Sequence, residues 1–234
     1  MNSQPNTATN LMAQLALVPA VEATVEATAK STEGGILTAK STEGGILTAI
    51  VKSTEGEILS NYFIETCRTV LPVLDKLGPS MAVIRSDIGG NIQRLEEICG
   101  SGKSEYKFLY EIVRKEAAEG TAKKPLSCTR AILWLTRAMD FSVVLLRDLM
   151  EQPEWSLKQA VEHAYNITLK QWHGWISAAA FKVGLKLIPE REKFIGLLGD
   201  MKGDTEKFIS VLPPVLQENH KFLQSLRLDR LKSS

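Results

Sequence analysis

Three polar residues in one helical stretch have the types and spacing to bind a ligand rich in hydroxyl groups. Asp87, Asn91 and Arg94 follow one another at intervals of four and three residues. On an α-helix, at about 100° per residue, Asn91 lies about 40° from Asp87 and Arg94 about 20° to the other side. A carboxylate, an amide and a guanidinium on one stripe offer acceptors, donors and a fixed positive fork, which suits recognition better than a reaction. The alternative is a solvated helix edge with pairing inside the helix.

Two adjacent glycines in the same stretch weaken that alternative. Gly89 and Gly90 would each cost a helix ~1 kcal/mol relative to alanine. Such a pair favours the close approach of a ligand or of another helix to this part of the chain.

Trp134 and His173 are further candidates for ligand binding, although each could instead be an ordinary interior residue. Trp134 lies in the apolar helical segment LWLTR at 133–137, where a tryptophan usually belongs to the core. His173 lies in the segment WHGW at 172–175, and a histidine between tryptophans is usually a satisfied interior side chain.

Catalytic templates match the sequence poorly. The chain has no HExxH zinc motif, no GxSxG nucleophile elbow and no phosphate-binding loop. An acid–base pair of Asp87 and His173 acting on a sphingolipid stays as the enzyme alternative, although no nucleophile accompanies it. We therefore expect a protein that is not an enzyme and that uses neither a metal nor a cofactor.

Charge and cysteine content argue against a nucleic-acid-binding, a disulfide-rich or a zinc-binding protein. Among 234 residues there are 28 Lys and Arg against 27 Asp and Glu, a net charge of +1, which argues against nucleic acid as a partner. Cys67, Cys99 and Cys128 are odd in number and far apart, so they fit neither a disulfide framework nor a zinc site. Buried thiols in a reducing compartment and the lack of a membrane-length apolar run predict a cytoplasmic protein.

The chain divides into two parts of different composition. Residues 1–56 are rich in Ala, Thr, Ser and Glu and contain an identical ten-residue duplication, 29–38 and 39–48. This composition predicts a disordered extension. Residues 57–234 show helical periodicity without strand-like alternation, which predicts one all-α domain.

The expected helices follow from apolar spacing, caps and prolines. We expect a first helix from Asn61 with a kink at Pro72, a second over 79–98, a third from Tyr106 and a long fourth capped by Ser127. A capping box at 156–159 opens a helix of about thirty residues that includes the WHGW segment. Two further helices are expected over 189–198 and from the Pro213-Pro214 pair to 226.

Taken together, these motifs resemble the glycolipid transfer protein family, plant-type members most of all. The resemblance rests on DIGGNIxR at 87–94, LWLTR at 133–137, WHGW at 172–175 and LPVLDKLG at 71–78. It extends from about residue 56 to the C-terminus and leaves out the duplicated segment. Several ordered, separated motifs are far more specific than any one of them.

The resemblance implies a two-layer helical sandwich, without a sheet, that encloses a sphingolipid. The family's sugar-binding Asp, Asn and Lys match Asp87, Asn91 and Arg94. Arginine in place of lysine keeps the charge but changes the donor geometry. The stacking tryptophan matches Trp134, and the histidine that bonds the ceramide amide region matches His173. These matches indicate the branch that binds neutral sugars.

The resemblance also implies docking to a membrane. The family's docking surface includes the tryptophan that matches Trp175. On one helix Trp172 would lie about 60° from it, so both are expected to meet the membrane interface, where tryptophan is favoured.

The function expected is non-enzymatic transfer of a glycosphingolipid between membranes. Its ~30 methylenes would gain ~24 kcal/mol on leaving water, but a bilayer offers the same gain. Selectivity must then come from the head group, where each unmatched polar group costs ~1–3 kcal/mol. A lipid sensor that signals through a protein partner and a ceramide-1-phosphate carrier remain as alternatives.

Overall fold

The computed structural model describes residues 57–101, 106–199 and 202–233. The duplicated segment within 1–56 lies outside these ranges. The described elements are helices, and no strand occurs among them, which confirms the all-α prediction. The described residues also contain one isolated β-bridge, between Leu59 and Phe108. The elements are α3 (Ser60–Arg68), α4 (Leu71–Leu77), η2 (Pro79–Met81), α5 (Ala82–Cys99), α6 (Leu109–Ala118), α7 (Cys128–Glu151), α8 (Leu157–Ile167), α9 (Trp175–Gly184), α10 (Arg191–Leu198) and α11 (Lys202–Ser225).

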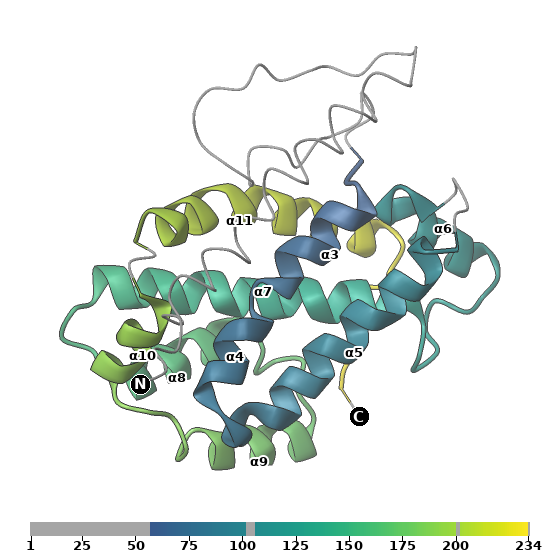
Figure 1. Cartoon of the computed structure of the whole chain (residues 1–234). Helices are drawn as coiled ribbons and strands as arrows, with labels where there is room; N and C mark the ends of the chain where they lie inside the picture. The colour runs from purple at the N-terminus through teal and green to yellow at the C-terminus, as the bar shows by residue number, and fades with distance from the viewer. Residues whose placement is uncertain (1–56, 102–105, 200–201, 234) are drawn as a thin grey trace, which may run out of the picture.

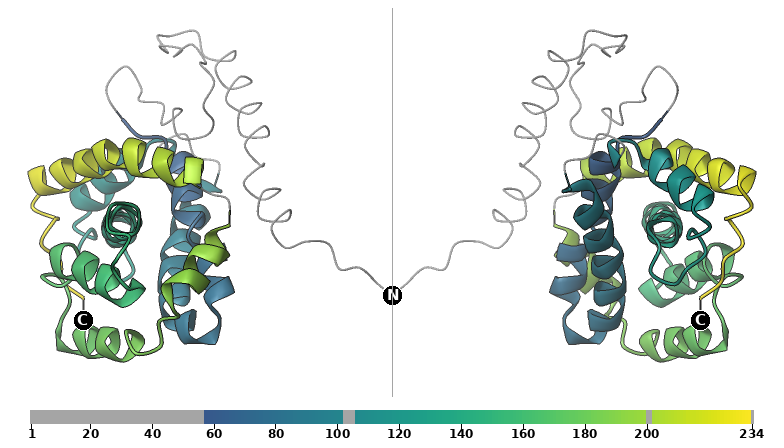
Figure 2. Two further views of the ribbon diagram at one scale, coloured as in Figure 1. Left: turned by 90° about the vertical axis from the view of Figure 1, so that its left-hand side faces the viewer. Right: turned by 90° about the vertical axis from the view of Figure 1, so that its right-hand side faces the viewer.

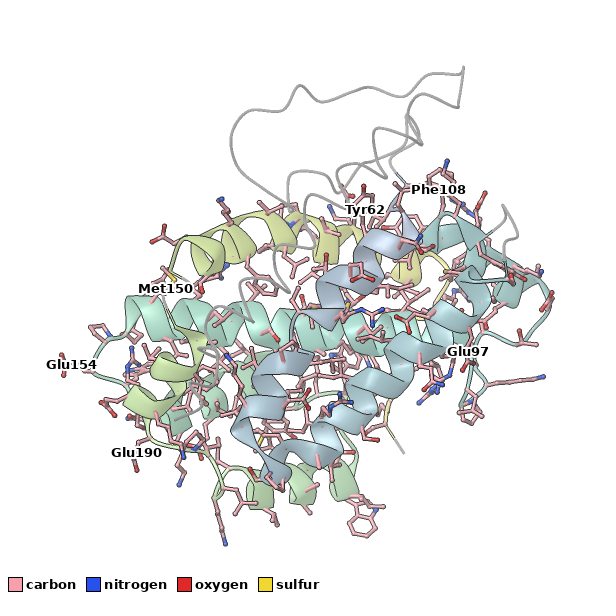
Figure 3. All side chains as sticks on the ribbon, viewed as in Figure 1. Tyr62, Glu97, Phe108, Met150, Glu154 and Glu190 are labelled. Carbon is pink, nitrogen blue, oxygen red and sulfur yellow. The ribbon has the colours of Figure 1, made fainter. Side chains whose placement is uncertain are left out.

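Helix α7 runs through the middle of the molecule and most other helices pack around it (Figure 1). Helices α5, α6, α8 and α11 all contact α7, while α3 and α4 pack on α5 and α10 packs on α4. Seen along α7, the helices α3, α4 and α5 form one layer beside it, with α11, α8 and α9 arranged around its other sides (Figure 2). Side chains fill the space between the layers (Figure 3).

The sequence around its N-terminus explains why α7 begins where it does. The Ser127 hydroxyl accepts a hydrogen bond from the Arg130 amide at 3.1 Å, as the predicted cap requires. The Glu116 carboxylate accepts from the Cys128 and Thr129 amides at 2.8 and 2.7 Å. A negative charge at this end also complements the helix dipole. Leucine, isoleucine and methionine side chains then bury much of the helix surface.

The predicted first helix is divided in two. Helix α3 ends at Arg68 and α4 begins at Leu71, with Pro72 in its first turn. Proline has no amide hydrogen for the preceding turn, so Pro72 ends one helix and starts the next. Gly78 then ends α4 with a φ of 85°, a conformation that glycine adopts without strain.

The predicted thirty-residue helix after Ser156 is wrong. The capping box between Ser156 and Gln159 is present, but α8 ends at Ile167 and α9 begins only at Trp175. The Lys170 amide bonds the Tyr165 carbonyl, five residues back, which breaks the helical hydrogen-bond series. Gly174 is in an extended conformation as the N-cap of α9.

The proline pair also lies elsewhere in its helix than expected. Pro213 and Pro214 are inside α11 and do not begin it. The missing amide hydrogens remove two helical hydrogen bonds, but Leu212, Val215 and Leu216 are buried in the core beside them. Packing of that apolar face therefore outweighs the local cost of the prolines.

The last described residue, Ser233, lies beside the loop that precedes α9. After α11 the backbone turns at Arg227, whose φ is 57°, and the final segment runs back across α7 toward α9 (Figures 1 and 2). Within the described ranges, no helix is both long and apolar enough to cross a membrane.

Candidate functional site

The three residues of the polar row on α5 lie on one stripe and are paired inside the helix, as the alternative of a paired helix edge also expects. The Asn91 amide nitrogen donates to the Asp87 backbone carbonyl at 2.9 Å, and Arg94 Nη1 donates to Asn91 Oδ1 at 2.9 Å. Asn91 is buried, while Asp87 is exposed. The Asp87 carboxylate accepts no hydrogen bond from the described part of the chain, so its oxygens are available to a ligand.

The charge of Asp87 is set by two opposing effects. Removal from water by the surrounding protein raises the pKa of this carboxyl, and the nearby positive charge of Arg94 lowers it. The rise is the larger effect, as expected for a carboxyl whose charged form is poorly solvated. The side chain stays exposed, so the carboxylate can accept hydrogen bonds from the hydroxyl groups of a ligand.

Gly89 and Gly90 lie beside the polar row, and no other helix approaches them closely. A Cβ placed on Gly90 would meet nothing within 4 Å, and one on Gly89 would meet only Arg85 Nη1 at 3.6 Å. The expectation that another helix comes close here is therefore wrong. Close approach of a ligand stays a prediction.

A second group of residues forms an aromatic cluster that begins on α7. The ring centroids of Trp134 and His173 are 5.7 Å apart, and those of His173 and Tyr165 are 5.5 Å apart. Tyr165 in turn stacks on Phe181 at 3.5 Å with an angle of 8° between the planes. The structure thus brings together the predicted Trp134 and His173. Tyr165 and Phe181 were not predicted, because only their positions in the fold place them beside His173.

Two buried polar atoms of this cluster have no hydrogen-bond partner. They are Nδ1 of His173 and the hydroxyl oxygen of Tyr165. Burial, with the positive charge of Arg137 as a smaller contribution, lowers the pKa of His173, so the imidazole is neutral at pH 7. Burial likewise raises the pKa of the Tyr165 hydroxyl, which stays protonated. Unpaired buried polar atoms are rare and need an explanation.

Arg137 packs against Trp134 of the cluster and against Trp172. Its guanidinium carbon lies 4.8 Å from the centroid of the Trp134 ring and 4.0 Å from that of Trp172. The residue is only 1% exposed, and burial lowers its pKa to about 10, which leaves it charged at pH 7. The sequence shows this arginine in LWLTR but not its position between two indole rings.

The two tryptophans of WHGW have different surroundings. Trp175 is the first residue of α9 and is 82% exposed, whereas Trp172 is half-buried against Arg137. The prediction that both lie on one helix is wrong, because the chain leaves α8 before Trp172. Whether either residue meets a membrane stays a prediction.

The row and the cluster lie on adjacent helices. Ile88 and Ile92 of α5 belong to the same core as Leu133 of α7. The described hydrogen bonds and ring contacts join residues within each group, and none of them connects Asp87 to Trp134. The packing of α5 on α7 brings the groups onto neighbouring parts of the fold.

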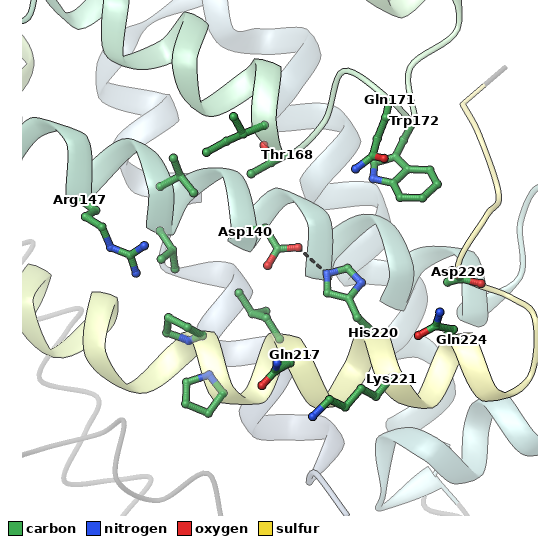
Figure 4. A pocket seen from close by; sticks show the side chains of 16 residues that line it. Asp140, Arg147, Thr168, Gln171, Trp172, Gln217, His220, Lys221, Gln224 and Asp229 are labelled. Carbon is green, nitrogen blue, oxygen red and sulfur yellow. Dashed lines mark hydrogen bonds and ion pairs between the residues drawn. The ribbon is translucent and has the colours of Figure 1, made fainter.

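A separate groove of about 880 Å³ lies between α7, the end of α8 and α11 (Figure 4). Asp140 and His220, which interact with each other, are among its lining residues, and Trp172 and Asp229 line one end. Among the described residues no group of three or more His, Cys, Asp or Glu side chains could hold a metal ion.

Comparison with known proteins identifies the family. The family model described as Glycolipid transfer protein (GLTP) matches residues 58–200. Glycolipid transfer protein 1 of Arabidopsis thaliana is 46% identical over 187 residues, covering 79% of this chain and 93% of that protein. Glycolipid transfer protein 3 of the same plant is 48% identical over 174 residues, covering 71% and 75%.

Solved structures agree with this assignment. The GLTP-fold structure of FAPP2, which selects simple glycosphingolipids, matches with a TM-score of 0.72 and 25% identity over 87% of this chain and 98% of that one. Human ceramide-1-phosphate transfer protein bound to 12:0 ceramide-1-phosphate shares the fold, with a TM-score of 0.67 and 22% identity over 80% and 97% of the chains. This chain therefore belongs to the glycolipid transfer protein family.

Proposed function

We propose that this protein binds a glycosphingolipid and carries it between membranes without changing it chemically. Membership of the family supports the transfer of a sphingolipid. The observation that carries the finer proposal is a row of polar groups on α5, a helix that packs on α7, together with an aromatic cluster that begins on α7 and whose His173 and Tyr165 have unpaired buried polar atoms.

The α5 row is proposed to bind the sugar. The free carboxylate of Asp87 accepts from sugar hydroxyls, and Arg94 fixes the amide of Asn91 by bonding its oxygen. Arg94 keeps further donors for the ligand, because a guanidinium has five N–H groups. Trp134 has Arg137 over one face, and we assign the sugar C–H groups to its other face.

His173 and Tyr165 are proposed to bind the polar region between sugar and chains. A neutral imidazole and a phenol can each donate or accept, and a ceramide offers an amide and a hydroxyl at this position. Each polar atom that stays buried and unpaired costs ~1–3 kcal/mol. Binding of the correct ligand removes this cost, and binding of a lipid without these groups does not.

The lipid chains are assigned to the apolar interior between the two layers. Transfer from bilayer to protein is then nearly neutral, because both surroundings bury the same methylenes. A carrier requires this balance, since tighter holding would prevent release.

One end of the molecule is proposed to dock transiently on a membrane. Trp175 and Ile176 of α9 are 82% and 55% exposed, and Val83 at the beginning of α5 is 78% exposed. Figures 1 and 2 place α9 and the beginning of α5 at the same end of the molecule. Exposed apolar side chains gathered at one end indicate an interaction surface. With a net charge of +1, we expect apolar contact that depends weakly on salt, and we propose a cytoplasmic location.

A transfer assay between vesicles tests this function. Donor vesicles carry glucosylceramide, plain ceramide or ceramide-1-phosphate, and mass spectrometry of the acceptor vesicles measures each lipid and any product. We expect transfer of intact glucosylceramide in clear preference to the other two. Preference for ceramide-1-phosphate would replace the sugar assignment, and release of free ceramide from glucosylceramide would establish the hydrolase alternative with Asp87 and His173.

The sensor alternative has its own test. Partner capture with full-length protein and with a variant lacking residues 1–56 shows whether the extension recruits a protein. A lipid-dependent partner that requires the extension would favour signalling over transport.

A further inference from the structure

The last described residues form hydrogen bonds with α7, with the loop before α9 and with the beginning of α9. We call residues 229–233 the C-terminal strap. Arg137 donates from Nη1 to the Leu231 carbonyl at 2.7 Å and from Nη2 to the Asp229 carbonyl. Arg130, which lies earlier on α7, donates to the Lys232 carbonyl at 2.9 Å. The strap is therefore held along α7 through backbone carbonyls.

The other end of the strap holds the loop before α9. The Ser233 amide donates to the Trp172 carbonyl at 3.0 Å. The Ser233 hydroxyl accepts from the Gly174 amide at 3.0 Å and lies 3.0 Å from the Ser177 hydroxyl. His173, between Trp172 and Gly174, is thus in a loop whose two neighbouring peptide groups both bond to Ser233.

The loop also has restraints of its own, among them the ring contacts of His173 with Trp134 and Tyr165. Its own hydrogen bonds include those from the Trp172 and His173 amides to the Leu169 carbonyl, at 2.9 and 3.2 Å. Trp172 also packs against the guanidinium of Arg137, which is the same group that holds the strap. Figure 4 shows Trp172 and Asp229 at the same end of the groove beside α7.

A buried cation in this place requires a reason. Arg137 is 1% exposed, and an isolated charge in the interior is costly. Two carbonyls and two indole faces compensate it, and each of these partners belongs to the strap or to a tryptophan near His173. Only the planar fork of arginine can bond two carbonyls and stack on two rings together.

We propose that Arg137 is a positioning residue that acts through the C-terminal strap. It sets the orientation of Trp134 directly and that of His173 through Trp172 and Ser233. Because Ser233 also bonds Gly174 and Ser177 at the beginning of α9, the strap joins the exposed Trp175 end of the molecule to the head-group residues. This inference rests on the proposed function for its ligand, but the connection between strap and loop can be measured without any lipid.

The first experiment measures that connection in the full-length protein without ligand. Hydrogen exchange at the Gly174 amide is compared in wild type, Ser233→Ala and a variant that ends at residue 228. We expect exchange to be about tenfold faster in Ser233→Ala, from the loss of one hydrogen bond, and faster still in the shortened chain. Unchanged exchange at Gly174 in both variants would overturn the proposal, whether or not the protein transfers glycolipid.

The second experiment asks whether Arg137 affects recognition and not folding alone. The affinities for glucosylceramide and for plain ceramide are measured in Arg137→Lys and in the matched control Arg147→Lys, also on α7 but without contact to the strap. We expect the ratio of the two affinities to fall about tenfold in Arg137→Lys, because lysine cannot replace the bidentate fork, and to be unchanged in the control.

A purely structural arginine would lower both affinities equally and leave their ratio unchanged, which would contradict the proposal. If Arg137→Lys does not fold, the hydrogen-exchange experiment on Ser233→Ala decides the proposal instead. If wild type binds no glucosylceramide, the proposed function fails, and the exchange experiment still decides whether the strap restrains the loop.

Discussion

The polar row on α5 and the aromatic cluster around His173 are held in place by different means. Asp87, Asn91 and Arg94 are oriented within one helix, through hydrogen bonds over three and four residues. The cluster combines residues of α7, α8, the loop before α9 and α9 itself, and Arg137 beside it bonds a carbonyl 94 positions away. The row can therefore be altered without disturbing the fold, whereas a change in the cluster affects both recognition and stability.

The sharpest test of this difference is Asp87→Val. Because Asp87 is exposed, we expect stability to change by no more than about 0.5 kcal/mol. Transfer of glucosylceramide should fall at least tenfold, because a sugar hydroxyl loses its acceptor. Vesicle transfer and thermal unfolding measure the two effects. Gln93→Val, exposed on another side of α5, is the control, and normal transfer by Asp87→Val would remove Asp87 from the site.

For Trp134→Ala we expect a loss of stability and a loss of lipid transfer. Trp134 is half-buried, so the cost in stability should be about 3 kcal/mol or less, together with a loss of transfer even when the assay is run cold. Trp134→Phe keeps a flat aromatic face and should recover part of the transfer. Normal cold transfer by the alanine variant, despite its lower melting temperature, would assign Trp134 to packing alone.

Trp175→Ala should affect docking but neither the row nor the cluster. The residue is 82% exposed, so its removal should leave the melting temperature unchanged and weaken binding to neutral vesicles roughly tenfold. Wild-type indole emission should shift to the blue on adding vesicles, and the variant should lose much of this shift. Leu126→Ala, at an exposed apolar position before α7, is the control. Equal vesicle binding by wild type and Trp175→Ala would disprove this docking surface.

The cluster should also respond to pH through His173. Burial lowers the pKa of this imidazole in the folded protein, so the unfolded chain takes up a proton at higher pH than the folded one. Its contribution to stability is then present above the unfolded pKa of about 6.5 and is lost as the pH falls below that value. Melting temperatures at pH 7.5 and 5.5 should differ more in wild type than in His173→Gln. An equal difference in the two proteins would mean that His173 does not titrate in this way.

The smallest effect is expected at Gly90. Nothing lies within 4 Å of an added Cβ, so Gly90→Ala should stabilise the protein by up to ~1 kcal/mol. If a ligand passes close to the row, the same methyl group should slow transfer by a few fold. A more stable variant with unchanged transfer would show that the glycine is not needed for ligand approach.

The sequence motifs predicted much of the candidate site but little of its support. DIGGNIxR, LWLTR and WHGW contain the polar row, Trp134 and His173, and the predicted caps at Ser127 and Ser156 are confirmed. Tyr165 and Phe181 carry no local signal, because an aromatic residue in an apolar helix looks the same whether it fills a core or lines a site. The interruption between α8 and α9 was not predicted because the apolar spacing continues across it.

Local sequence was sufficient to predict most helices, their caps, the polar row and the family, since these depend on contacts over a few residues and on the order of motifs. Only tertiary contacts explain why Pro213 and Pro214 lie inside α11, why Trp172 is half-buried while Trp175 is exposed, and why the end of the chain returns to His173. The physical reason is that burial of an apolar face can exceed a local helix penalty. Likewise, a buried guanidinium must find acceptors wherever the fold places them, here in a segment 94 positions along the chain.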